Sequence, residues 1–266
     1  MKRMLLAALS ATLALLLLSG CAAPKPDADT LSVAATAIPH AEILRQVQPI
    51  LAKEGVQLEI KVFADYVQPN TLVAERQVDL NYFQTKPYLD AFNREHGTRL
   101  VPIVGVHIEP FGAYSRRFKS IDQLPVGATV ALPNDPSNEA RALRLLARHG
   151  LITLKDPAAA LATVKEIAAN PRQLTFKELE AAMLPRTLDE VDLALINTNY
   201  ALAAGLNPVR DALLIEGSDS PYVNYLVGRA DNLHDPRVQK LARALTSPAI
   251  RRFIETKYRG AVLPAL

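Results

Sequence analysis

The chain has 266 residues, with 30 Lys or Arg and 27 Asp or Glu, and Lys2 and Arg3 are the only charged residues among the first twenty. The remaining body has 28 basic against 27 acidic side chains, so it lacks the basic excess with which a protein neutralises nucleic-acid phosphates. A content of 49% hydrophobic and 21% charged residues is globular, and a single Cys excludes an intrachain disulfide and a cysteine-based zinc or iron–sulfur site.

The first twenty residues predict an export signal. Lys2 and Arg3 precede an apolar run from Met4 to Leu18, and the small residues Ser19 and Gly20 follow. This run is shorter than the ~20 residues that cross a bilayer comfortably, and no later segment is long and apolar enough to do so. Residues 1–20 are therefore interpreted as a signal peptide.

The only Cys of the chain, Cys21, stands directly after these small residues. The sequence LSGC resembles the bacterial lipobox, in which the thiol receives fatty chains such as palmitate and the Cys becomes the new N-terminus. The alternative is a plain secretory signal followed by a chance Cys. Residues 21–29 are short, polar and contain Pro, and they are interpreted as a lipidated tether to a membrane that faces the periplasm or exterior.

The body alternates short apolar runs with segments of helical spacing. In a first cycle, strands are predicted at 31–36, 56–63, 78–83, 100–106 and 111–114, and helices at 39–54, 71–76 and 86–95. In a second cycle, strands are predicted at 128–132, 174–176, 191–196 and 222–227, and helices at 140–149, 198–204, 236–245 and 248–257. Strands separated by helices predict mainly parallel sheets, here in two α/β lobes. A ligand is expected between the strand ends of the two lobes.

The motifs of common enzymes are missing. The sequence has no G-x-S-x-G, P-loop or H-E-x-x-H, and none of its five His pairs with another at metal-ligand spacing. His107 and Glu109 could form one edge of a metal site, but two residues on one face of a strand is the preferred interpretation. We therefore expect neither an enzyme nor a metal or other cofactor.

Four segments at predicted strand ends carry polar and aromatic residues. Phe83 and Thr85 end a predicted strand in LNYFQTKPYL and are candidates for a cleft wall; the alternative is that Phe83 belongs to the core. Arg141 follows the turn PNDPSN, at a helix N-terminus that suits an anion. There Arg141 can clamp a carboxylate, although an ordinary surface Arg is the alternative. Asn197 follows a strand, and either Asn197 or Thr198 can simply cap the next helix. A buried Asn224 needs partners from the backbone or a ligand.

Together with the lipobox, these segments resemble the NlpA/MetQ family of bacterial substrate-binding lipoproteins. The similarity rests on DLNYFQTKPYLD, PNDPSNEARAL, LPRTLDEVDLALINTNYA and SPYVNYLV, and it extends over nearly the whole chain after Cys21. It implies a two-lobed type II periplasmic-binding-protein fold, with a ligand cleft between lobe I (30–114 plus 222–266) and lobe II (115–221). It further implies a monomer that closes about its hinge and delivers methionine to the permease and ATPase of an ABC transporter.

The resemblance also assigns ligand-binding residues. Tyr66 and Phe83 match aromatic positions around the methionine side chain. Arg141 matches the position that binds the α-carboxylate. Asn197 and Asn224 match the positions that hold the amino and carboxylate ends of the ligand. Thr85 stands where methionine binders of the family commonly have His, which leaves L-methionine, D-methionine, another apolar amino acid and a methionine-containing dipeptide open. An envelope interaction protein with a vestigial cleft is the alternative from another class.

Overall fold

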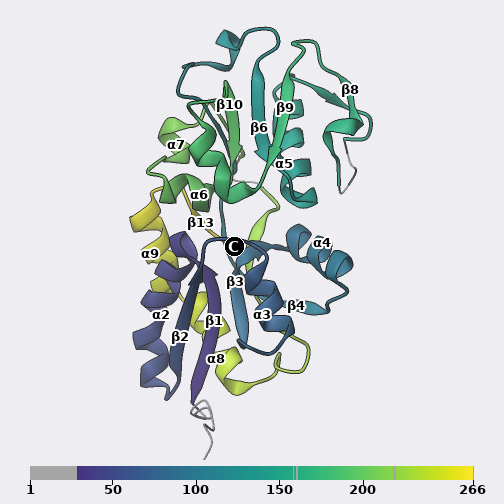
Figure 1. Cartoon of the computed structure of the whole chain (residues 1–266). Helices are drawn as coiled ribbons and strands as arrows, with labels where there is room; N and C mark the ends of the chain where they lie inside the picture. The colour runs from purple at the N-terminus through teal and green to yellow at the C-terminus, as the bar shows by residue number, and fades with distance from the viewer. Residues whose placement is uncertain (1–28, 158, 160, 218–219, 266) are drawn as a thin grey trace, which may run out of the picture. The chain divides into compact units, whose positions relative to one another are not determined.

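The computed structural model describes residues 29–157, 159, 161–217 and 220–265, and the chain from Leu31 onward forms one compact unit. Its strands form a six-stranded sheet, a five-stranded sheet and a two-stranded ribbon (Figure 1). The predicted signal peptide, Cys21 and most of the predicted tether lie outside the described residues.

The six-stranded sheet has the strand order β13-β4-β12-β3-β1-β2 and, with its helices, is called lobe I below. Its strands are β1 (Thr30–Thr36), β2 (Gln57–Phe63), β3 (Leu80–Thr85), β4 (Leu100–Ile108), β12 (Val223–Arg229) and β13 (Leu263–Pro264). The helical segments are η1 (Ala37–Ala41), α2 (Glu42–Lys53), α3 (Gln68–Ala74), α4 (Lys86–His96), α8 (Pro236–Leu245) and α9 (Pro248–Tyr258).

Alternating side chains place a core on each face of this sheet, because successive residues of a strand point to opposite sides. Val33 and Ala35 of β1 pack in a cluster with α2, α8 and α9, whereas Ala34 packs with α3 and α4. In β12, Leu226 packs on the face of α2, α8 and α9, and Val227 packs on the face of α3 and α4. The C-terminal helices α8 and α9 thus pack in the same core as β1 and α2.

The five-stranded sheet has the order β11-β5-β10-β6-β9 and, with its helices, is called lobe II. Its strands are β5 (Gly112–Tyr114), β6 (Thr129–Pro133), β9 (Thr175–Leu179), β10 (Leu193–Ile196) and β11 (Leu214–Ile215), and the ribbon consists of β7 (Thr153–Leu154) and β8 (Ile167–Ala169). The helical segments are α5 (Pro136–Arg148), α6 (Thr198–Ala203), α7 (Pro208–Asp211), η2 (Ile121–Gln123), η3 (Val164–Glu166) and η4 (Ala181–Thr187).

Lobe II also has a core on both faces of its sheet. Val130 and Leu132 of β6 pack in the cluster that contains Leu143 of α5, and Ala131 packs with Leu184 of η4 and Ala201 of α6. The separate cores explain why the chain builds two lobes, each of which covers its own sheet on both sides.

The prediction of mainly parallel sheets is wrong. Parallel pairing joins β1 to β3 and β6 to both β9 and β10, but β12 runs antiparallel to β3 and β4, and β5 runs antiparallel to β10 and β11. The reason is the crossing between the lobes. Strands β5 and β12 each begin after the chain has crossed from the other lobe, so they run opposite to the strands that end at the site.

Strand pairing moves the first crossing upstream of the predicted one. Residues 112–114 were predicted to belong to the first lobe, with the crossing at 114–115. Because β5 pairs with β10 and β11, sheet membership places this strand in lobe II, and the crossing lies between Ile108 and Gly112. The return lies between Ile215 and Val223.

Helix α5 begins four residues earlier than predicted. Asp135 is its N-cap, and its carboxylate accepts a hydrogen bond from the Asn138 backbone N–H at 2.9 Å. Pro136 then occupies the first helical position, where its missing N–H costs nothing. The segment PNDPSN, which was interpreted as a turn, therefore contains the cap and the first helical turn.

Candidate functional site

One cavity gathers all six ligand-binding candidates of the sequence analysis. Its lining residues from lobe I and the crossings are Tyr66, Phe83, Gln84, Thr85, Tyr88, Glu109 and Asn224, and those from lobe II are Asn138, Arg141, Asn197, Thr198 and Asn199. The cavity volume is about 20 Å³, which is room for a single water molecule. The sequence therefore selected one place in the fold, at the ends of strands from both lobes.

Strand register aligns the lobe I wall. Asn224 of β12 lies opposite Thr85 of β3 on one side and opposite His107 of β4 on the other. Thr85 ends β3 and is the N-cap residue of α4. The site thus lies at the carboxyl end of the parallel strand β3, where open α/β sheets bind ligands.

The lobe II wall consists of two helix starts after parallel strands. Arg141 and Asn138 belong to the first turns of α5, which follows β6, and Asn197 is the N-cap residue of α6, which follows β10. The Asn197 side chain makes no capping hydrogen bond, so its amide is available to the cavity. Asn197 thus occupies the capping position that the sequence left open for it, but its side chain does not cap the helix.

Aromatic rings form the apolar part of the cavity. The ring of Tyr66 lies 5.7 Å from Phe83, 5.6 Å from Tyr88 and 5.0 Å from Tyr200, measured between centroids. The Tyr66 hydroxyl donates to Asn199 Oδ1 at 2.6 Å, which joins the two lobes across the site. Tyr88 and Tyr200 were not singled out from the sequence, because an aromatic residue in a helix more often belongs to a core.

Arg141 has a counter-ion within the protein, Glu216. Its Nε donates to Glu216 Oε1 at 2.8 Å and its Nη2 to Oε2 at 2.6 Å, while Nη2 also donates to the Glu109 backbone oxygen at 2.8 Å. The guanidinium stacks 4.2 Å from the Tyr222 ring centroid and 5.1 Å from that of Phe111. Arg141 is only 3% exposed, so it is not the ordinary surface Arg that the sequence left open.

Glu216 also ties Arg141 to both crossings between the lobes. Its Oε2 accepts from the Phe111 backbone N–H and from the Ser220 hydroxyl, each at 3.1 Å. Burial alone would raise the pKa of Glu216, but the charge and hydrogen bonds of Arg141 outweigh burial and hold that pKa below its usual value. No sequence pattern indicated Glu216, because a lone acid before a Gly is common on protein surfaces.

The two candidate amides of the site present opposite ends. Asn197 Nδ2 donates to Asn138 Oδ1 at 2.9 Å, and Asn138 in turn donates to the Asp135 carboxylate. Asn197 Oδ1 is buried and has no hydrogen-bond partner among the described residues. In Asn224 the oxygen is the bonded end of the amide, because Oδ1 lies 3.1 Å from His40 Nε2. Its Nδ2 has no partner in the described part of the chain.

Behind Asn224 lies a buried cluster of His40, His107 and Glu109. Glu109 Oε1 lies 2.8 Å from His107 Nε2 and 3.2 Å from His40 Nε2. Burial lowers the pKa of His40 to about 4 and that of His107 to about 3, so both are neutral at pH 7. Burial raises the pKa of Glu109, although the nearby His40 and Arg141 oppose this effect.

This cluster is also a possible donor set for a cation. Its three ligand atoms lie within 4.8 Å of one another. A hydrogen bond already joins His107 to Glu109, and His40 Nε2 is bonded to Asn224 Oδ1. The other ring nitrogens are bonded as well, His40 Nδ1 to the Thr36 hydroxyl at 2.7 Å and His107 Nδ1 to the Tyr82 hydroxyl. The sequence pattern indicated the His107–Glu109 pair on one strand face but not His40, which lies 67 residues earlier in the chain.

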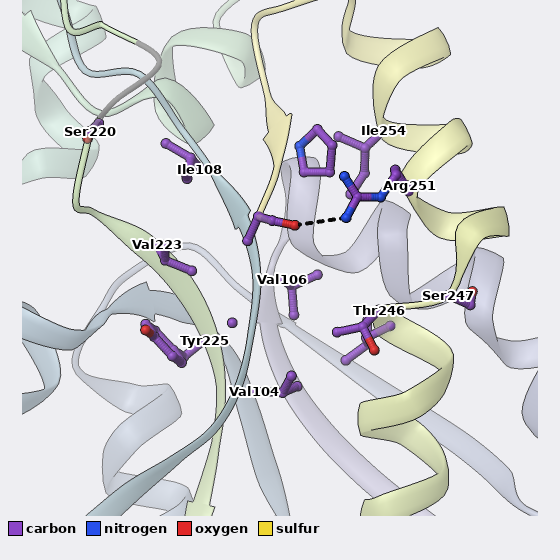
Figure 2. Close-up of a pocket in the computed structure, with 14 residues that line it drawn as sticks. Val104, Val106, Ile108, Ser220, Val223, Tyr225, Thr246, Ser247, Arg251 and Ile254 are labelled. Atoms are coloured by element: carbon purple, nitrogen blue, oxygen red, sulfur yellow. Dashed lines mark hydrogen bonds between the residues drawn. The ribbon is translucent and has the colours of Figure 1, made fainter.

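A second, larger cavity lies elsewhere in lobe I (Figure 2). It measures about 710 Å³ and is lined by β4, β12, β13, helix α9 and the connection from α8 to α9, with mostly apolar side chains such as Val104, Val106 and Ile254. At its edge Arg251 donates to the Ala265 backbone oxygen at 3.3 Å. None of the six candidate residues lines this cavity.

A polar and aromatic cavity between two α/β lobes, with the chain crossing between them, defines a two-lobed solute-binding protein. Comparison with known proteins agrees with this class, because the sequence model of the NlpA lipoprotein family matches residues 31–266. The chain belongs to the NlpA lipoprotein family. The family and the fold class expected from the sequence are both confirmed.

Relatives and solved structures resemble the chain over nearly its whole length. The D-methionine-binding lipoprotein MetQ of Yersinia pestis is 39% identical over 262 residues, which are 97% of this chain and 96% of that protein. A nutrient binding protein from Burkholderia cenocepacia bound to methionine has a TM-score of 0.86 and 44% identity, covering 89% of this chain and all of that one. An ABC transporter periplasmic substrate-binding protein from Coxiella burnetii has a TM-score of 0.85 and 43% identity, with 88% and 100% coverage.

Within the part of the chain that the structure describes, no helix is both long and apolar enough to cross a bilayer.

Proposed function

We propose that this chain is an extracytoplasmic solute-binding lipoprotein, anchored through Cys21, that binds methionine and delivers it to an ABC transporter. The relatives named above support the ligand and the transporter, since their names include methionine binding and transport. The role is non-catalytic binding by a monomer, with the permease and ATPase as partners.

The observation that carries this proposal is the unpartnered Asn197 Oδ1. A buried carbonyl oxygen without a hydrogen bond costs free energy, so it indicates a donor that belongs in the cavity. The α-ammonium group of an amino acid is such a donor. Arg141 and Asn224 Nδ2 supply donors for the α-carboxylate, and the cavity therefore offers both halves of a zwitterion.

The aromatic residues suit the remaining part of methionine. The neighbouring rings of Tyr66 and Phe83 form an apolar wall of the cavity. Against such a wall, each contact between a thioether sulfur and an aromatic ring contributes ~0.3–1.5 kcal/mol. Thr85 lies at the same wall and leaves the choice between L- and D-methionine, other apolar amino acids and a methionine-containing dipeptide to experiment.

Binding requires the lobes to separate. A cavity of about 20 Å³ admits water but no amino acid, so the ligand reaches the site only when the two walls move apart. The described parts of the two crossings, 109–111 on one side and 216–217 with 220–222 on the other, are the segments that bend in such a hinge motion. The Tyr66–Asn199 hydrogen bond breaks and reforms with it.

A thermal-shift panel tests the proposal. Full-length protein in detergent is unfolded, freed of ligand and refolded, and then heated with L-methionine, D-methionine, a Gly-Met dipeptide or other amino acids. At a hundredfold excess over Kd, a specific ligand adds ~2.7 kcal/mol to the free energy of unfolding. A methionine-specific rise in Tm supports the proposal. A rise in Tm only with another amino acid or a dipeptide identifies that compound, instead of methionine, as the ligand. If no compound raises Tm, an envelope interaction role is favoured.

A further inference from the structure

His40 lies at the centre of a buried hydrogen-bond chain that ends at the cavity. It belongs to the short segment η1, directly after β1, and it is 1% exposed. Its partners are Thr36 at the end of β1 and Asn224 in β12, which is 184 residues later in the sequence. His40 itself does not line the cavity, so any effect on a ligand acts through Asn224.

The partners determine which nitrogen of His40 carries hydrogen. Asn224 Oδ1 can only accept, so His40 Nε2 is the donor of the 3.1 Å hydrogen bond between them. The ring is neutral, and its Nδ1 therefore accepts the hydrogen bond from the Thr36 hydroxyl at 2.7 Å. Glu109 Oε1, 3.2 Å from the same Nε2, is a second acceptor that keeps the hydrogen on this nitrogen.

This arrangement determines which end of the Asn224 amide faces the cavity. A rotated amide would place its NH₂ group against the His40 N–H, and two donors would then face each other without an acceptor. Leaving a buried donor unsatisfied in this way is unfavourable, because the group loses its hydrogen bonds to water and gains none in the protein. With Oδ1 held by His40, the Nδ2 group is left for the cavity, where it has no partner among the described residues.

We propose that His40 is a positioning residue that fixes Asn224 as a hydrogen-bond donor to the ligand carboxylate. Asn197, whose unpartnered end is an acceptor, takes the ammonium group instead. The two amides together then set the direction in which an amino acid lies in the cavity. This inference rests on the proposed function, because it assigns the two ends of the same zwitterionic ligand.

The test compares L-methionine with L-methioninol, in which a neutral alcohol replaces the carboxylate. Calorimetric titrations use full-length protein in detergent, as wild type, as His40→Leu and as His40→Gln. In His40→Leu we expect methionine affinity to fall roughly 10- to 100-fold, as for a hydrogen bond to a charged group, and methioninol affinity to change less than threefold. His40→Gln retains an amide donor near the position of Nε2 and should restore most of the preference for methionine.

A second variant tests the direction of the Asn224 amide without touching His40. Asn224→Asp keeps the oxygen that accepts from His40 but turns a second oxygen, instead of an NH₂ group, toward the cavity. Methionine binding should be lost by more than 100-fold through repulsion of two carboxylates, while methioninol binding persists. Equal losses for both ligands in Asn224→Asp, or in His40→Leu, would overturn the proposed positioning role.

The His40 tautomer gives a readout that needs no substitution. ¹⁵N spectra of the wild-type protein at pH 7 should show His40 with hydrogen on Nε2 and a bare Nδ1. A hydrogen on Nδ1 would overturn the proposal even if no variant folds. Wild-type protein that binds neither methionine nor methioninol would instead refute the proposed function, and the inference with it, whereas methionine binding without selective losses refutes only the role of His40.

Discussion

Arg141 and Glu216 form a bidentate buried ion pair, with both nitrogen–oxygen distances at or below 2.8 Å, at the wall of the cavity. The expected carboxylate clamp is therefore not a lone cation waiting for a ligand. Its charge is already balanced by Glu216, which is hydrogen-bonded to both crossings between the lobes. A ligand carboxylate shares Arg141 with Glu216, so affinity and stability respond differently to substitution of the two residues.

Arg141→Ala should weaken methionine binding by about 2–3 kcal/mol, or roughly 30- to 150-fold, because a hydrogen bond to a charged group is lost. It should also lower the free energy of unfolding, since Glu216 is left buried without its partner. In Arg141→Ala/Glu216→Gln, stability should partly return while binding does not. Calorimetry and urea unfolding measure both, with the exposed Arg45→Ala as control. Full-strength binding by Arg141→Ala would contradict the clamp.

Glu216→Gln should destabilise the ligand-free protein by about 3 kcal/mol, because removing one member of a buried ion pair leaves the other charge uncompensated. Methionine affinity should not fall, since the ligand no longer shares Arg141 with a carboxylate. Urea unfolding with and without methionine measures this, and Glu54→Gln at an exposed position is the matched control. A loss of affinity with unchanged stability would show that Glu216 contacts the ligand instead.

Acid should destabilise the fold through His40 and His107. Burial lowers their pKa values from 6.5 to about 4 and about 3, so below pH 6.5 the unfolded chain takes up protons that the folded chain does not. The free energy of unfolding therefore decreases as the pH is lowered. Each His contributes about 2 kcal/mol to this decrease between pH 7 and pH 5. Glu109 acts in the opposite direction, because burial raises its pKa and the folded state gains its proton first.

Urea unfolding at pH 7, 6 and 5 measures this dependence. The His107→Asn variant should lose roughly half of it, whereas His234→Asn, at an exposed position, should leave it unchanged. A pH dependence in His107→Asn equal to that of the wild-type protein would be inconsistent with a neutral buried His107.

Tyr66→Phe should weaken methionine binding by about 1 kcal/mol, or roughly fivefold, since the closed site loses the hydrogen bond from the Tyr66 hydroxyl to Asn199 across the lobes. The ring and its contacts with Phe83 remain. Titration calorimetry compares it with Tyr225→Phe, which removes a hydroxyl outside this site. If Tyr66→Phe binds methionine as tightly as Tyr225→Phe does, the Tyr66 hydroxyl has no role in closure of the lobes.

Much of the fold followed from local patterns in the sequence. Helices α8 and α9 begin at Pro236 and Pro248, the residues that were predicted, because Pro after a capping Asp235 or Ser247 marks a helix start. Strand direction did not follow, since the direction of β12 depends on a crossing from the other lobe. The sheet that contains residues 112–114 likewise depends on pairing partners far away in the chain.

The candidate site divides in the same way. Asn197 and Arg141 were found because they follow strand ends, which the period of apolar residues reveals. Their partners Asn138 and Glu216 were not, because no spacing rule links residues 59 or 75 positions apart. His40 was considered only as a His without a neighbour, and its link to Asn224 exists only once β1 and β12 belong to the same sheet.

The most direct test of the account is a calorimetric titration of L-methionine into full-length protein that was unfolded, freed of ligand and refolded. We predict saturable binding of one methionine per chain, and a loss of at least 30-fold in affinity in Arg141→Ala. No heat of binding in refolded wild-type protein, together with no competition by L- or D-methionine against any other bound ligand, would contradict it.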